Sequence, residues 1–223
     1  MAEMDLFEVM YNARSLRRLK PDPVPDELIY KVIDAGIRAP SGGNTQYWCF
    51  VVVKDPEVKK QVQACYLKGW REVQLMYRDR PAPAHMGQEK FQRLMGAATY
   101  LAEHLHEVPV LLFAGLRARP MPAGEAGAQL AAKLARLSGS SIYPAVQNIL
   151  LACRALGLGA TLTTVCSLYE EEIRLILGLP DDISTYAMIP IGYPRGRFGP
   201  VSRVPVEEVT RVDRWDSGKK LQR

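Results

Sequence analysis

Apolar residues recur along this chain in two patterns, and each pattern predicts a different kind of element. Leu6, Val9 and Met10 are spaced as on a short helix, and a longer helical face extends from 28 to 37 after Asp26, which has the residue type of an N-cap. Two uninterrupted apolar runs, 48–53 and 108–113, have the composition of strands that are buried on both faces. The stretch 145–156 is apolar nearly all round, which predicts a central, fully packed helix.

The remaining elements are predicted by weaker patterns. The stretch 57–107 has a helical composition with one interruption at Arg80-Pro81-Ala82-Pro83, which predicts two exposed helices flanking a loop. A short strand at 160–164, a helix at 169–177 and a core strand at 188–191 complete the chain. The order of elements is not a regular strand–helix–strand alternation. We therefore predict an α+β fold with a mixed, mainly antiparallel central sheet flanked by helices, in a single domain that spans 1–223.

The segment Gly157-Leu158-Gly159 has the glycine spacing that starts a dinucleotide-binding fingerprint, but its position differs. It lacks the third glycine and follows a helix, whereas the fingerprint links a strand to a helix. We therefore interpret Gly157 as a helix C-cap and Gly159 as a glycine required by close packing.

Composition narrows the classes of function. The 223 residues carry a formal net charge of +5, which favours anionic partners. Basic and acidic residues alternate along most of the chain without a basic motif interleaved with aromatic residues, so we expect small phosphorylated ligands and no nucleic acid. The N-terminus has no basic stretch ahead of an apolar one and the apolar runs are too short to span a bilayer, so we expect a cytoplasmic protein without membrane contact. The four cysteines form no CxxC pair and are interpreted as packing residues.

Four segments carry groups that suit ligand binding. Arg14-Ser15-Leu16-Arg17 can direct guanidinium and hydroxyl donors at one anion, although its spacing also fits a solvated helix end. The turn 40–48 combines glycines with Ser41, Asn44 and Gln46, whose groups suit carbonyls and ring nitrogens. Small and hydroxylated residues follow the central helix at 159–164, and Arg203 follows the last predicted strand. Each segment alone would also pass as an ordinary turn.

Together these segments resemble the nitroreductase family of FMN enzymes. The motifs occur in the family's order: Arg14-Ser15-Leu16-Arg17, Ser41…Asn44…Gln46…Trp48, Leu156–Gly159, Gly192–Pro194 and Arg203-Val204-Pro205. The resemblance covers roughly 6–209. One departure is Tyr47, where the family usually has proline.

The resemblance implies an FMN cofactor, NAD(P)H as electron donor and a homodimer. Arg14, Ser15, Arg17 and Arg203 would hold the phosphate and ribityl of FMN. Ser41, Gly42 and Asn44 would border the isoalloxazine, in this family usually from the partner subunit. Leu162, Thr163 and Thr164 would face its N5/O4 edge. The flavin N5 carries the hydride, so no catalytic side chain and no metal is expected.

The reaction that we expect is ping-pong reduction of a nitroaromatic or quinone by NAD(P)H. The segments 66–96 and 117–141 would form the lid of the pocket, with Tyr77 and Trp70 as candidate contacts to an aromatic acceptor, and 203–223 would be a C-terminal extension. The chain also resembles the halotyrosine deiodinase branch, which clamps a zwitterionic amino acid with a Glu, a Tyr and a Lys. The lid here contains Glu72, Tyr77 and Lys90, but not in the Glu-x-x-x-Tyr spacing of that branch. Reductive dehalogenation of halogenated phenols or tyrosines is therefore the alternative, and a non-enzymatic basic binding module is the alternative from another class.

Overall fold

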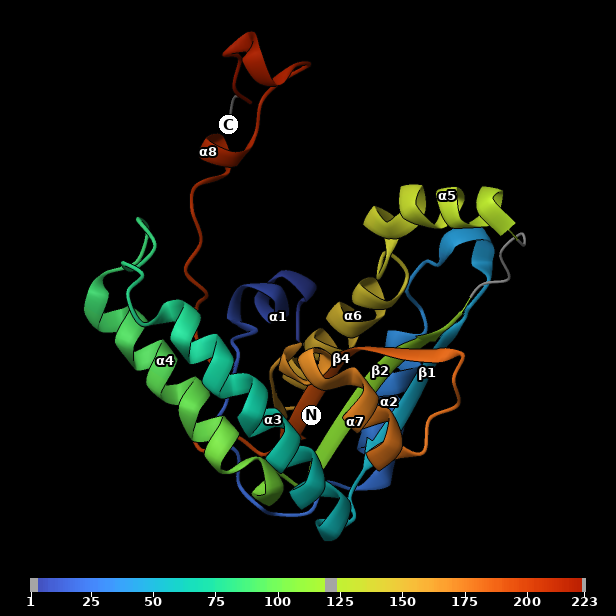
Figure 1. Ribbon diagram of the computed structural model, residues 1–223. Helices are drawn as coiled ribbons and strands as arrows, with labels where there is room; N and C mark the ends of the chain where they lie inside the picture. The colour runs from blue at the N-terminus through green and yellow to red at the C-terminus, as the bar shows by residue number, and fades with distance from the viewer. Residues whose placement is uncertain (1–3, 119–123, 222–223) are drawn as a thin grey trace.

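A four-stranded antiparallel sheet forms the centre of the described residues. The computed structural model describes 4–118 and 124–221. The strands lie in the order β1 (Trp48–Val53), β2 (Val110–Arg117), β4 (Ile183–Gly192) and β3 (Gly159–Ala160), and each neighbouring pair is antiparallel. Helices cover this sheet (Figure 1). The predicted α+β fold with a mainly antiparallel sheet is confirmed.

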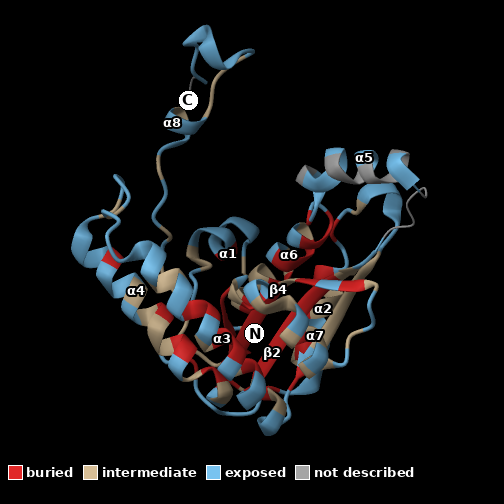
Figure 2. Ribbon diagram, viewed as in Figure 1, coloured by how far each residue is buried: buried red, intermediate tan, exposed pale blue. Residues whose placement is uncertain are grey.

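Alternation along β2 assigns its side chains to two hydrophobic clusters. Leu111 and Phe113 join a cluster with α3 (Pro56–Tyr77), α4 (Gln88–Glu103) and α7 (Glu170–Leu177). Val110 and Leu112 join a second cluster with α2 (Asp26–Gly36) and α6 (Ile142–Ala155). Because successive side chains of a strand point to opposite faces, the sheet lies between two helical layers. Buried residues are concentrated on these inner strands and on the helix faces turned toward them (Figure 2).

Shorter elements connect this framework. Helix α1 (Leu6–Asn12) precedes it, and α5 (Gly124–Leu134) lies between β2 and α6. The 3-10 turns are η1 (Gly42–Asn44), η2 (Leu105–Glu107), η3 (Ala135–Leu137), η4 (Val165–Tyr169) and η5 (Trp215–Ser217). After β4 the chain leaves the body as an extended arm that carries α8 (Val206–Val209), drawn in red in Figure 1. No helix within 4–118 or 124–221 has the length and apolar content needed to cross a membrane.

Three expectations need correction. Strand β1 was expected to be buried on both faces, but it pairs only with β2 at the edge of the sheet, and Val52 is 38% exposed. Helix α3 is not merely a surface helix, because Val62, Cys65, Tyr66 and Trp70 are buried on its inner face. Asp26 is the first helical residue and Pro25 occupies the N-cap position, and the Asp26 carboxylate pairs with Lys54 instead of capping the helix. Of the expected lid and extension segments, 119–123 and 222–223 lie outside the described residues.

The two glycines after α6 have the roles that the sequence predicts. Gly157 has φ +74°, and the Leu158 N–H donates to the Cys153 carbonyl over 2.8 Å, which closes the helix. Gly159 lies where β3 meets the N-terminal loop. A Cβ there would lie 2.7 Å from Leu19 Cδ2 and 3.2 Å from Pro194 Cβ, so only glycine fits without movement of its neighbours.

We therefore predict that Gly159→Ala lowers the free energy of unfolding by about 1–3 kcal/mol through overpacking. The matched control is Gly96→Ala in α4, where an added Cβ meets nothing within 4 Å. It should raise stability by about 0.5–1 kcal/mol, since alanine is the better helix former. Denaturant unfolding of both variants measures the difference. Equal stability of the two variants would contradict the packing role of Gly159.

Candidate functional site

Three segments that are distant in sequence meet around a cavity of about 600 Å³. They are the loop after α1, the inner face of α4 and the chain just before the C-terminal arm. Its lining residues are Ala13, Arg14, Ser15, Arg17, Met86, Lys90, Arg93, Leu94, Ala97, Pro200, Val201, Ser202 and Arg203. The sequence-predicted residues Arg14, Ser15, Arg17 and Arg203 are thus brought together, although almost the whole domain separates them in sequence.

Backbone hydrogen bonds hold the arginine loop against the edge of the sheet. The Leu16 N–H donates to the Ala160 carbonyl over 3.1 Å, and the Lys20 N–H donates to the Tyr193 carbonyl over 2.8 Å. Leu19, which is buried, forms a bridge with Pro194. Arg14 and Arg17 therefore project from a loop that is fixed by β3 and the end of β4.

The cavity is strongly cationic. Five of its lining side chains are Arg or Lys, and none of them is Asp or Glu. Arg17 is half-buried, and its burial lowers the pKa of the guanidinium below its ordinary value. Such a charge is stabilised when an anion binds beside it, so this wall fits a phosphate or a carboxylate.

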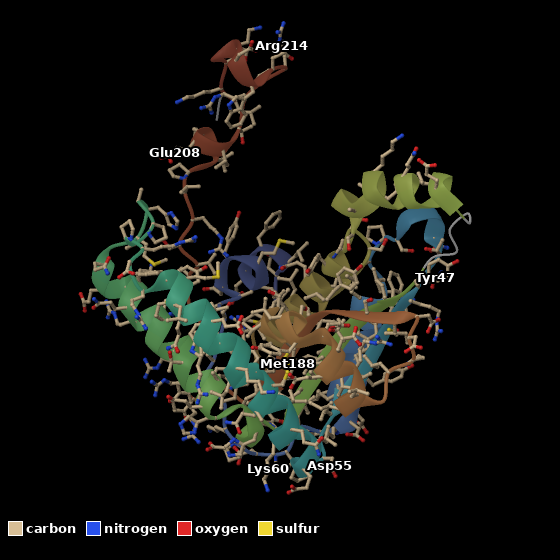
Figure 3. The ribbon with its side chains drawn as sticks, in the orientation of Figure 1. Tyr47, Asp55, Lys60, Met188, Glu208 and Arg214 are labelled. Atoms are coloured by element: carbon tan, nitrogen blue, oxygen red, sulfur yellow. The ribbon has the colours of Figure 1, made fainter. Side chains whose placement is uncertain are left out.

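A buried tyrosine links Arg17 to the predicted segment 162–164. The Tyr66 hydroxyl lies 3.1 Å from Thr163 Oγ1, and Thr163 exchanges two backbone hydrogen bonds with Met188 of β4, which is labelled in Figure 3. Burial raises the pKa of Tyr66, with the nearby Arg17 charge opposing, so the hydroxyl stays protonated at neutral pH. Leu162 and Thr164 are exposed on either side of Thr163. This segment is therefore held in place while its flanking side chains face solvent.

A smaller cavity of about 40 Å³ adjoins the arginine loop. Arg14 and Ser15 line both cavities, and the smaller one is also lined by Thr161 and Arg154. Thr161 is 1% exposed and its hydroxyl has no protein partner, and Arg154 Nε is likewise unpartnered. Buried polar groups are normally satisfied, and this volume has room for one water molecule. The Thr161 hydroxyl and Arg154 Nε, next to Arg14, are therefore available to a polar ligand or a water molecule.

The turn 41–46 lies away from this cavity. Its backbone is held by Gly42 N–H, which donates to Ser141 Oγ over 3.2 Å, and by Gln46 N–H, which donates to Ser41 Oγ over 3.1 Å. Asn44 and Gln46 have φ of 53° and 54°, a conformation that costs free energy for non-glycine residues. Tyr47 lies at the far side of the molecule from α4 (Figure 3). Within one chain, Ser41, Gly42 and Asn44 are therefore not brought to the arginines.

The two predicted acceptor contacts also lie apart. Trp70 is buried between α3 and α4, and its indole N–H donates to Thr99 Oγ1 over 3.2 Å. Tyr77 lines a separate hollow with Arg78, Arg80 and Phe91. The sequence reasoning did not assign Arg93, Arg154 or Thr161 to the site. For Arg93 a signal was available, because Lys90 and Arg93 are three apart and so share one helix face.

Ser15, Ser202 and Lys90 carry the nucleophilic groups of the cavity, and the described lining residues include no carboxylate or imidazole that could act as their base. Cys166 is 2% exposed and burial raises its pKa, which agrees with the packing role that the sequence predicts for it. The charge of the lining therefore suits an anionic molecule.

Comparison with known proteins gives the family of the chain. The model of the nitroreductase family matches residues 10–193. The chain belongs to the nitroreductase family. This family member is 32% identical over 218 residues to a protein named NADH dehydrogenase from Thermus thermophilus, covering 92% of this chain and 95% of that one.

Deiodinases are also among the relatives. The nitroreductase-family chain is 30% identical over 195 residues to iodotyrosine deiodinase 1 of Rattus norvegicus, covering 87% of this chain but 64% of the longer rat protein. The crystal structure of an oxidised iodotyrosine deiodinase, bound to FMN and 3-iodo-L-tyrosine, superposes with a TM-score of 0.70 at 22% identity, covering 95% of this chain and all of that one. Membership of the family and the likeness to the deiodinase branch, both predicted from sequence, are confirmed.

Proposed function

We propose that this chain is an FMN-dependent oxidoreductase that uses NAD(P)H to reduce nitroaromatic or quinone acceptors. The observation that carries the proposal is the cationic cavity, in which Arg14, Arg17 and Arg203 converge in a member of the nitroreductase family. Solved relatives named for their FMN and NADPH dependence support the choice of cofactor and donor. We further propose a cytoplasmic location.

The chain's own groups bind and orient the cofactor in this proposal. Arg14, Arg17 and Arg203 neutralise the phosphate, and the Ser15 hydroxyl donates to it or to the ribityl chain. The cofactor's redox-active ring then lies along Leu162, Thr163 and Thr164, whose backbone is fixed by β4 and by Tyr66. Fixed donors beside the ring would favour its reduced, more negative form.

Bound FMN supplies the hydride chemistry, because a flavin accepts two electrons from a nicotinamide and passes them on. For a nitro compound the sum is NAD(P)H + H⁺ + ArNO₂ → NAD(P)⁺ + ArNO + H₂O. Donor and acceptor would enter the same side of the cavity in turn.

Reductive dehalogenation is the second candidate, and the identity with the deiodinases favours it. The local geometry does not add support. The Tyr169 hydroxyl donates to Glu72, Tyr77 lines a different hollow and Lys90 lines the cationic cavity, so these three side chains are not gathered around one ligand. Reduction of a neutral or anionic aromatic is therefore the better-supported activity.

Surface area supports a homodimer. The chain exposes 13805 Å², whereas a compact monomer of 24.9 kDa is expected to expose about 10,000 Å². The excess includes apolar side chains on α1 and on the C-terminal arm, such as Phe7 at 59% and Trp215 at 71% exposure. A second copy that covers these residues would also bring a second 41–46 turn, which is the proposed source of Ser41, Gly42 and Asn44 near the isoalloxazine.

The activity is tested by colour. Purified protein, or protein incubated with FMN, should be yellow and should bleach under anaerobic conditions when NADH or NADPH is added. A nitroaromatic, a quinone and a halophenol are then added to separate samples. The acceptor class that the protein reduces should restore the yellow colour. Colourless protein that takes up no FMN would reject the proposal in favour of a non-enzymatic basic binding module.

Arg203→Ala should weaken FMN binding roughly 10- to 100-fold, because it removes one charge-assisted contact to the phosphate. Titration of the apoprotein with FMN gives the dissociation constant. Lys60→Ala is the control, since Lys60 pairs with Glu57 at the exposed start of α3 and does not line the cavity. Equal FMN affinity in wild type and Arg203→Ala would remove Arg203 from the phosphate site.

The dimer is tested by mass in solution. Light scattering should give about 50 kDa, twice the chain mass of 24.9 kDa. Truncation after Arg203 should increase dissociation on dilution, because it removes the apolar arm residues that a second copy would cover. A monomeric protein that binds FMN at full occupancy would contradict the proposed contribution of the second 41–46 turn.

A further inference from the structure

Helix α4 turns a mixed apolar and cationic face to the cavity. Lys90, Arg93, Leu94 and Ala97 line it, and their spacing of three and four residues places them on one side of the helix. Met86, just before α4, continues the same wall. The wall therefore presents two positive charges one turn apart beside apolar surface.

These two charges exceed what the proposed cofactor requires. A phosphate monoester carries at most two negative charges near neutral pH, and Arg14, Arg17 and Arg203 already supply three positive ones. No carboxylate lines the cavity. Arg93 pairs with Glu89 at 3.3 Å, but both side chains are largely exposed, so this pair is weak and Arg93 can exchange it for a ligand.

We propose that Lys90 and Arg93 form a second anion subsite, which binds an anionic group on the molecule that exchanges over the cofactor. This inference rests on the proposed function. The apolar residues Met86, Leu94 and Ala97 would contact the organic frame of that molecule. The described lining residues include no Asp or Glu, and Glu89 beside Arg93 is outweighed by five lining cations, so the preferred ligand is an anion and not a zwitterion.

Two sources could supply this group: a carboxylate on the aromatic acceptor, or the additional phosphate that distinguishes NADPH from NADH. Both present oxygen anions to Lys90 and Arg93. With NADPH the subsite would serve reduction of the cofactor, and with an anionic acceptor it would serve reoxidation of the cofactor. Matched substrate pairs separate them. In one arm 4-nitrobenzoate is compared with neutral 4-nitrobenzamide, and in the other NADPH is compared with NADH.

The variants are Lys90→Ala and Arg93→Ala in the FMN-loaded full-length protein. The control is Lys60→Ala. The Lys60 side chain pairs with Glu57 near the N-terminus of α3, far from α8 and the arm (Figure 3). Bound FMN is measured in every sample, so that failure of the cofactor site is recognised separately from failure of the subsite. Bleaching by NADH without an effect of either variant would leave the proposed function standing.

Each variant should lower kcat/KM for the anionic member of one pair about tenfold, with little change for the neutral or less charged member. A selective loss with 4-nitrobenzoate assigns the subsite to the acceptor, and a selective loss with NADPH assigns it to the donor. Raising the ionic strength should reduce the same preference in wild type. Equal losses for both members of each pair, or no loss with any substrate, would overturn the subsite.

Discussion

Burial of β2 and β4 on both faces is the constraint on which the rest of the fold depends. Their side chains are apolar on each face, so two helical layers are needed to cover them: α3, α4 and α7 on one side, and α2 and α6 on the other. β3 contributes only two residues, Gly159 and Ala160, to the β4 edge. The loop 14–20 completes this edge through backbone hydrogen bonds to Ala160 and Tyr193. The arginines are therefore positioned by the same edge pairing that closes the core.

The arginines at this edge cost little desolvation free energy, because they lie on a loop and not in the core. Arg14 is exposed and Arg17 is half-buried, so only the Arg17 guanidinium is partly desolvated. Tyr66 and Thr163 lie beside it as neutral, mutually hydrogen-bonded groups, which supply polarity without a competing negative charge. An internal carboxylate would neutralise Arg17 but would also compete with an incoming anion. Its absence from the lining favours ligand binding over the stability of the ligand-free chain.

The elements and the fold class could be predicted from the sequence because their signals are local. An uninterrupted apolar run identifies β2, helical spacing identifies α2 and an all-round apolar stretch identifies α6, and Gly157 marks the end of α6 through its left-handed backbone. The exposure of each strand's side chains could not be predicted from such local signals. The β1 run has the same apolar composition as β2, yet β1 lies at the edge, since strand order is decided by tertiary pairing.

In the site, too, residue types could be predicted from the sequence and their tertiary contacts could not. Convergence of Arg14 with Arg203 depends on how the chain returns after β4, and no spacing within either motif encodes it. Trp70 and Tyr77 have the residue types of aromatic contacts, but the packing of α3 on α4 buries one and turns the other to a separate hollow. The spacing of Lys90 and Arg93 places them on one face of α4, but only the packing of α4 beside the loop 14–17 puts that face at the cavity.

The strained turn 43–46 is explained best by a role outside the single chain. Asn44 and Gln46 both have left-handed backbone conformations, and hydrogen bonds from Gly42 and Gln46 to two serines maintain them. Such conformations cost on the order of 1–3 kcal/mol each and persist where the surrounding structure fixes them. Within one chain this turn meets no cationic cavity, and it continues into the edge strand β1, whose face is only half covered. A second copy placed against this edge would cover β1, shelter the apolar arm and give the strained backbone a ligand to contact. Dimerisation and completion of the cofactor site are then two consequences of one interface.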